Sequence, residues 1–262
     1  MTVDERLNLI RVKVERAKKH IRELEAEIQS FLATKPYAVG AKRDPETKRP
    51  IYYVVSVRDT PIKIAVIAGD VIQNLRSALD HLAYQLVIVG TGKTPSAHIY
   101  FPIADDAAKY KAQRSGKTKG MRPEAVKAID ALKPYKGGND TLWLIHKLNN
   151  VDKHRVLLTV GSAYHSFNVG TIMQRELQKS FSSVPARLDL FLKPADRKFP
   201  LKQGDELFMD LPDAEVNSQV QFVFEVAFGE SQIIEGKPLI ETLKQMGDFV
   251  DNLVLTFKPL LA

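Results

Sequence analysis

Arg76 and His81, five residues apart in the segment 74–82, are the side chains of this sequence best suited to chemistry on a phosphate ester. A guanidinium presents a rigid fork of N–H donors that matches the oxygens of a phosphate group. An imidazole with an ordinary pKa can accept the proton of a ribose 2′-hydroxyl group near neutral pH. The resulting attack on the neighbouring phosphate would cleave RNA without a metal ion and leave a cyclic phosphate end.

The element that carries these two residues is predicted to be a long helix over residues 62–89. Its apolar face contains Val71, Leu75, Ala78, Leu79, Leu82 and Leu86, and its opposite face contains Asp70, Asn74, Ser77 and His81. Five residues turn an α-helix by about 140°, so Arg76 and His81 diverge on one helix. They could converge only with help from a second helix or a second protomer. In a competing interpretation, Arg76 and Asp80 form an ordinary i,i+4 ion pair.

The segment from Arg76 to His81 resembles the HEPN superfamily, helical proteins whose motif is an arginine, four to six residues, and a histidine. Many members are ribonucleases of toxin and antiviral systems, which cut RNA without metal at a cleft between two protomers. The resemblance implies that Arg76 holds the scissile phosphate and that His81 moves protons. It further implies RNA as substrate, a homodimer, no cofactor, and a role in a toxin or phage-defence system. It covers the motif helix and the presence of other helices, but not the β segment.

Three segments, 69–82, 101–103 and 149–155, look like a group of uncharacterised bacterial proteins, which implies a bacterial or phage origin and no particular activity. The last segment places Asn150, Asp152, Lys153 and His154 at a predicted helix-to-strand junction. Asp152 could orient His154 or simply end the helix. The density of polar side chains suggests one cleft shared with the long helix; the alternative is a buried polar network that fixes helix register.

Within that hypothesis, the predicted catalytic residues are Arg76, His81, His154 and Asn150. The predicted binding residues are Asp70, Asn74, Ser77, Asp152 and Lys153. The competing hypothesis is a non-catalytic protein that oligomerises or binds a partner through its long helices.

Other kinds of site have little support in the sequence. The segment 90–94 mimics a phosphate-binding loop, but Pro95 follows it and no helix is predicted there to supply amide donors. The chain has no cysteine, and its six histidines form no His-Glu-x-x-His or comparable pattern. We therefore expect no metal site and no cofactor.

The formal charge of +7 and the isoelectric point of about 9.4 favour an anionic partner, unless the cations are simply spread over a solvated surface. The most basic stretch, residues 109–122, contains two glycines and is interpreted as a mobile loop. The start of the chain has no apolar signal core, and no apolar run approaches the roughly 20 residues that a bilayer requires. We expect a cytoplasmic protein without a membrane segment.

Heptad-spaced apolar residues predict long helices at 3–33 and 238–257, and shorter helices are expected at 105–113, 123–132 and 140–153. A hairpin is predicted at 37–58, and strands at 156–160, 188–192, 206–209 and 220–226. We predict one α+β domain over residues 1–262, a long-helix bundle packed with an antiparallel β-sheet that the hairpin joins. Its helical core is 1–34, 60–155 and 237–262, and its β segments are 36–58 and 156–230.

Overall fold

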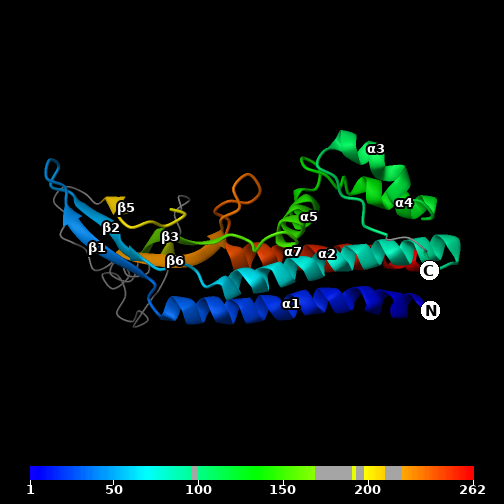
Figure 1. Ribbon diagram of the computed structural model, residues 1–262, viewed down its shortest axis with the longest axis horizontal. Coiled ribbons are helices and arrows are strands. Elements are labelled where there is room, and N and C mark those ends of the chain that lie inside the picture. The colour runs from blue at the N-terminus through cyan, green and yellow to red at the C-terminus, as the bar shows by residue number, and fades with distance from the viewer. Residues whose placement is uncertain (96–98, 169–190, 193–197, 210–219) are drawn as a thin grey trace, which may run out of the picture.

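The computed structural model describes residues 1–95, 99–168, 191–192, 198–209 and 220–262. Three long helices lie side by side: α1 (Val3–Ala33), α2 (Ile62–Thr91) and α7 (Leu239–Thr256). Figure 1 shows that they run from the β strands at one end of the molecule to the opposite end, where both chain termini lie. This arrangement confirms the predicted α+β class with a long-helix bundle.

The helix α1 follows its predicted range because both its start and its buried face are encoded locally. Thr2 and Glu5 form a capping box, in which each side chain binds the backbone N–H of the other residue. The heptad-spaced apolar residues are buried, namely Leu7, Ile10, Val14, Ala17, Ile21, Leu24, Ile28 and Phe31. They pack against α2 and α7, so the bundle is internal to one chain.

The helix α2 lies at the centre of the bundle and buries more than its predicted apolar face. Every residue predicted for that face is at most 1% exposed. Ile64, Ala65 and Ile67 are buried as well, because α1, α5 and α7 all contact this helix. The helix ends at Gly92, whose φ of +67° is the left-handed conformation that glycine adopts without strain.

The described strands form two antiparallel three-stranded sheets, which corrects the single sheet predicted from the sequence. One contains β1 (Tyr37–Arg43), β2 (Pro50–Val57) and β5 (Glu206–Met209). The other contains β4 (Phe191–Leu192), β3 (Thr159–Asn168) and β6 (Val220–Phe228). Aromatic rings join them: Tyr52 contacts Phe222 at 5.6 Å, and Tyr37 contacts Phe224 at 5.1 Å between ring centres.

Two strand predictions change. The predicted strand 156–160 begins only at Thr159, because the side chain of Glu230 takes the place of a strand partner. Its carboxylate accepts hydrogen bonds from the Arg155 guanidinium and, at 2.7 Å, from the Leu158 N–H. Of the predicted strand 188–192, only residues 191–192 are described, and the rest lies outside the described residues.

Three shorter helices lie on one side of the bundle: α3 (Ala107–Lys117), α4 (Pro123–Ala131) and α5 (Asp140–Asp152). Figure 1 shows α5 near the middle of the bundle and α3 and α4 toward the end where the termini lie. A 3₁₀ turn, η1 (Lys258–Leu261), follows α7. The interpretation of residues 109–122 as a mobile loop is wrong, since helix continues to Lys117. Asp106 caps α3 by accepting the Lys109 N–H at 2.7 Å, and Arg114 holds Asp130 of α4. No helix in the described parts of the chain is both long and apolar enough to cross a bilayer.

Candidate functional site at the contact of α2 and α5

The Arg76 side chain is buried inside the protein, and only 6% of the residue is exposed. Its Nη2 atom donates to the carbonyl oxygen of Phe101 at 3.0 Å and lies 2.8 Å from Oδ1 of Asp80. The same Asp80 oxygen accepts the N–H of Phe101 at 2.8 Å. Arg76 and Asp80 therefore bind the carbonyl and the N–H of Phe101, an arrangement that we call the clamp on Phe101. The competing prediction of an i,i+4 ion pair is confirmed.

This clamp follows from the local sequence around Phe101. The Phe101 ring is fully buried, and the segment that carries it lies outside any helix or strand. The N–H and carbonyl groups of a buried residue outside any strand need hydrogen-bond partners from other parts of the protein. One helical turn of α2 supplies both, because Arg76 donates and Asp80 accepts on the same face.

Two further basic side chains, Lys117 of α3 and His146 of α5, share the electrostatic surroundings of this pair. We call Arg76, Asp80, Lys117 and His146 the Arg76 cluster. Burial lowers the pKa of Lys117, and the charge of Arg76 lowers it further. Burial also lowers the pKa of His146, to about 4, with the charges of Arg76 and Lys117 adding to the shift. The His146 ring is therefore neutral at pH 7.

Within the pair itself, burial opposes both charges while mutual attraction favours them. Burial lowers the pKa of Arg76, and the neighbouring Asp80 carboxylate counters this effect. Burial raises the pKa of Asp80, and the Arg76 charge and the Phe101 N–H counter it. Asp80 is thus the negative partner of Arg76, and its charge also opposes the lowering of the Lys117 pKa by burial.

Two buried nitrogens of the cluster, Nη1 of Arg76 and Nδ1 of His146, have no hydrogen-bond partner among the described residues. The other ring nitrogen of His146, Nε2, lies 3.2 Å from the Asn150 side-chain amide. When the amide NH₂ group faces Nε2, the ring proton sits on Nδ1; when the amide is reversed, Nδ1 carries the lone pair. In both cases Nδ1 is the ring atom left for another group.

The cluster has a charged rim on α3 and α5. Asp105 forms ion pairs with Lys147 and, at 3.0 Å, with Lys109. Hydrogen bonds from these two lysines lower the pKa of Asp105 to about 2. Two cations thus share one carboxylate at the edge of the site.

His81, the predicted partner of Arg76, faces a different part of the molecule. It is exposed, and its Nδ1 atom lies 3.4 Å from the carbonyl oxygen of Leu9 on α1. Arg76 instead faces Phe101, so the two side chains leave α2 in different directions, as the turn of about 140° predicts. A single chain does not bring the guanidinium and this imidazole together.

The predicted binding residues of α2 lie along a partly exposed face. Asp70 is exposed, while Asn74 and Ser77 are half-buried. The Asn74 amide donates to the backbone carbonyl of Asp70 at 2.8 Å, one turn earlier. Asn74 therefore serves its own helix in this structure.

The end of α5 packs against the early part of α2. A Cβ atom added to Gly69 would lie 2.1 Å from Oδ1 of Asp152, so glycine is what allows this close approach. Burial, and after it the charge of Asp70, raises the pKa of Asp152. Asp70 and Asp152 are neighbours, as the predicted cleft requires.

His81 lies further along α2 than this contact with Asp152. His81 comes twelve residues after Gly69, which corresponds to roughly 18 Å along the helix axis. The cleft that includes both ends stays a prediction, and the charges of Lys153 and His81 both act on Asp80. Lys153 and His154 are exposed beyond the end of α5, and Asn150 contacts His146.

Sequence reasoning missed that the charge of Arg76 acts on His146 and Lys117. A signal for His146 was present, since it precedes Asn150 by four residues and so shares a helix face with it. Nothing in the local sequence indicated that this face would meet Arg76. Lys117 belongs to the basic stretch that was interpreted as a loop.

Among the described residues, no group of three or more metal-ligating side chains could hold a metal ion. Comparisons of the chain with protein-family models, with curated proteins and with solved structures find no match.

Proposed function

We propose that this protein is a metal-independent RNA endonuclease of HEPN type whose reacting groups lie in the Arg76 cluster. The supporting observation is that a buried guanidinium with a free N–H face shares its surroundings with an imidazole that is neutral at pH 7. In this proposal the imidazole comes from His146 on α5 rather than from His81 of the motif.

The chemistry assigns one task to each side chain. The Asn150 amide is reversed in this mechanism, so that its oxygen accepts the Nε2–H of His146 and Nδ1 carries the lone pair. Nδ1 then accepts the proton of a ribose 2′-hydroxyl, whose oxygen forms a bond to the adjacent phosphorus. The bond from phosphorus to the 5′-oxygen breaks, and Lys117, whose pKa is lowered, protonates that oxygen. Arg76 balances the charge on the phosphoryl oxygens. The products are a 2′,3′-cyclic phosphate and a 5′-hydroxyl end.

Access to Arg76 requires that the Phe101 segment move. Only 6% of Arg76 is exposed, so a phosphate cannot reach Nη1 while the Phe101 segment covers it. When that segment moves, Nη2 exchanges its hydrogen bond to the Phe101 carbonyl for one to the phosphate, and Nη1 becomes accessible. The charge excess of the chain, +7, assists the approach of a polyanion.

The test compares two histidine variants in an RNA-cleavage assay that contains EDTA. His146→Gln removes the imidazole of the cluster, and His81→Gln is its matched control on α2. We expect His146→Gln to slow cleavage by about 100-fold or more, and His81→Gln to leave the rate within about two-fold. His146 is half-buried, so its replacement can lower stability as well as remove the imidazole. Thermal unfolding of both variants therefore separates a loss of catalysis from a loss of folded protein.

Each outcome of this comparison has a defined meaning. If only His81→Gln abolishes cleavage, the reaction uses a site shared by two protomers, as the motif resemblance implies, and the assignment to His146 is overturned. Cleavage that requires a divalent metal would contradict the mechanism for both histidines.

A second candidate function is a non-catalytic protein that oligomerises or binds a partner. The observation in its favour is the clamp on Phe101, in which Arg76 and Asp80 bind the buried backbone groups of Phe101 and each other. This structural role accounts for both residues without catalysis. Absence of cleavage by the wild type would support this candidate. Light scattering tests the homodimer that both candidates include, since a dimer has twice the chain mass of 29.4 kDa.

A further inference from the structure

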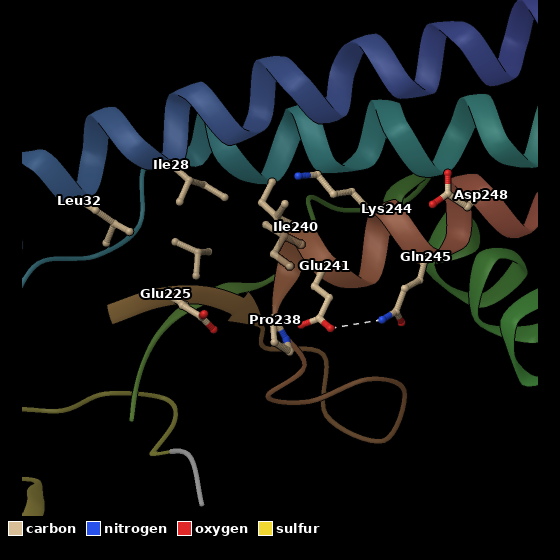
Figure 2. Close-up of a pocket in the computed structure, with 11 residues that line it drawn as sticks. Ile28, Leu32, Glu225, Pro238, Ile240, Glu241, Lys244, Gln245 and Asp248 are labelled. Atoms are coloured by element: carbon tan, nitrogen blue, oxygen red, sulfur yellow. Dashed lines mark hydrogen bonds between the residues drawn. The ribbon is translucent and has the colours of Figure 1, made fainter. Parts of the chain in front are cut away.

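A pocket of about 440 Å³ lies where the helical bundle meets the strands, far along the bundle from the Arg76 cluster. Figure 2 shows the end of α1 above it and the beginning of α7 beside it, with the end of β6 below. The lining residues used here are Ile28, Leu32, Ile240, Glu241, Gln245 and Asp248. The volume falls within the range of small-molecule sites, roughly 300–1,000 Å³.

The inner wall of the pocket is aliphatic. Ile28 and Leu32 extend into it from the last turns of α1, and Ile240 faces them from the first turn of α7 (Figure 2). Ile28 is almost fully buried, while Leu32 and Ile240 are partly exposed. An alkyl chain placed against these side chains would remove apolar surface from water.

The outer rim carries negative charge on one face of α7. Glu241, Gln245 and Asp248 are spaced four and three residues apart, so their side chains follow one stripe of the helix. The Gln245 amide donates to the Glu241 carboxylate at 3.3 Å (Figure 2). The cation of the rim, Lys244, is bound by Glu25 of α1 at 3.0 Å. The carboxylates of Glu241 and Asp248 therefore face the pocket mouth without compensation by Lys244.

We propose that this pocket binds a small organic cation with an aliphatic body, such as a protonated alkylamine. The alkyl body lies on Ile28, Leu32 and Ile240, and the ammonium group pairs with the Glu241 carboxylate. Asp248, two helical turns further along the rim, adds a second negative charge. This local preference runs against the charge of the whole chain, +7, which repels cations elsewhere. The site does not depend on RNA cleavage or on the Arg76 cluster.

The test is isothermal titration of the full chain with three probes of equal chain length, n-octylamine, n-octanol and n-octanoate. We expect n-octylamine, protonated at pH 7, to bind most tightly and n-octanoate most weakly, at least ten-fold apart. Glu241→Gln should weaken n-octylamine by up to about five-fold, and the double variant with Asp248→Asn should weaken it more. Both side chains are exposed, so folding should be unaffected.

The matched control is Glu124→Gln on α4, which removes the same charge from an exposed position in a helix remote from the pocket. It should leave all three affinities unchanged, because it alters only the net charge. Equal affinity for n-octanol and n-octylamine would overturn the proposal, since it would mean that the carboxylates do not take part. So would an equal loss in Glu124→Gln and Glu241→Gln, or no binding of n-octylamine.

Discussion

Asp80→Asn should destabilise the protein strongly, although the substitution hardly changes the size of the side chain. Asparagine can still accept the Phe101 N–H through its Oδ1 atom, so the backbone bond at 2.8 Å survives. What disappears is the negative charge 2.8 Å from the Arg76 guanidinium. The variant therefore isolates the cost of leaving a buried cation without its counter-charge.

The magnitude follows from the burial of the two partners. Removing one member of a fully buried ion pair costs about 3–5 kcal/mol. The Arg76 side chain is 8% exposed but the Asp80 side chain is 21% exposed, so water can replace part of the lost interaction. We expect a loss of about 2–3 kcal/mol in the free energy of unfolding.

Asp130→Asn is the matched control for this variant. Asp130 also pairs with an arginine, Arg114, but the two side chains are 31% and 41% exposed. Pairs at such positions contribute about 1 kcal/mol or less. Urea titration at pH 7 measures both losses from the shift of the midpoint at constant slope. A loss in Asp80→Asn no larger than that in Asp130→Asn would refute the view that Arg76 depends on Asp80.

Three further predictions test the same structure. Gly69→Ala should destabilise the contact of α2 with α5, measured by thermal unfolding, and Asp152→Gly should rescue it, because the added Cβ meets Asp152. Tyr37→Phe should be neutral or stabilising in urea titration, since its buried hydroxyl has no partner among the described residues. The pKa of His146 is about 4 in the folded protein and 6.5 in the unfolded chain, so the unfolded chain takes up its proton first as the pH falls. The stability that neutral His146 contributes above pH 6.5 is therefore lost between pH 6.5 and 4. In His146→Gln, the free energy of unfolding from urea titration should depend less on pH in this range.

The parts of the fold that could be predicted are those encoded within one element. The helix α1 has its cap at Thr2 and its stop before Pro36, and a heptad stripe fills the interval, so both bounds follow from the sequence. The hairpin of β1 and β2 is similarly local. Its strongest strand is β-branched and aromatic, and Asp44 stabilises the turn by accepting the Thr47 N–H at 2.7 Å.

Sheet membership could not be predicted in the same way, because strand periodicity shows which face is apolar but does not identify the partner strand. The hairpin pairs with β5, more than 140 residues later, through contacts such as Ile51 with Met209. β3 pairs instead with β6. Which strands pair depends on the path of the chain between the helical part and the sheets. No pattern within a single strand indicates that path.

The candidate site has the same division between local and non-local information. The pairing of Arg76 with Asp80 lies within one helical turn and was predictable. The influence of the Arg76 charge on His146 was not, because His146 is 70 residues away in the sequence and comes under that charge only through the packing of α5 on α2. The motif spacing selects His81, but helix phase turns that ring toward Leu9.

In the proposed function, a motif defined by spacing along one helix indicates the helix but not both members of the reacting pair. Two residues five positions apart can act on one phosphate only when a second element supplies the missing direction, either α5 of the same chain or a helix of a second copy. These two cases differ in one observable. A site that uses His146 lies within one chain, so its proposed activity should not depend on protein concentration. A site that uses His81 across two protomers should lose specific activity on dilution below the dissociation constant of the dimer. A rate per chain that stays constant on dilution, together with loss in His146→Gln, would support the first case; a rate that falls with dilution and is insensitive to His146→Gln would exclude it.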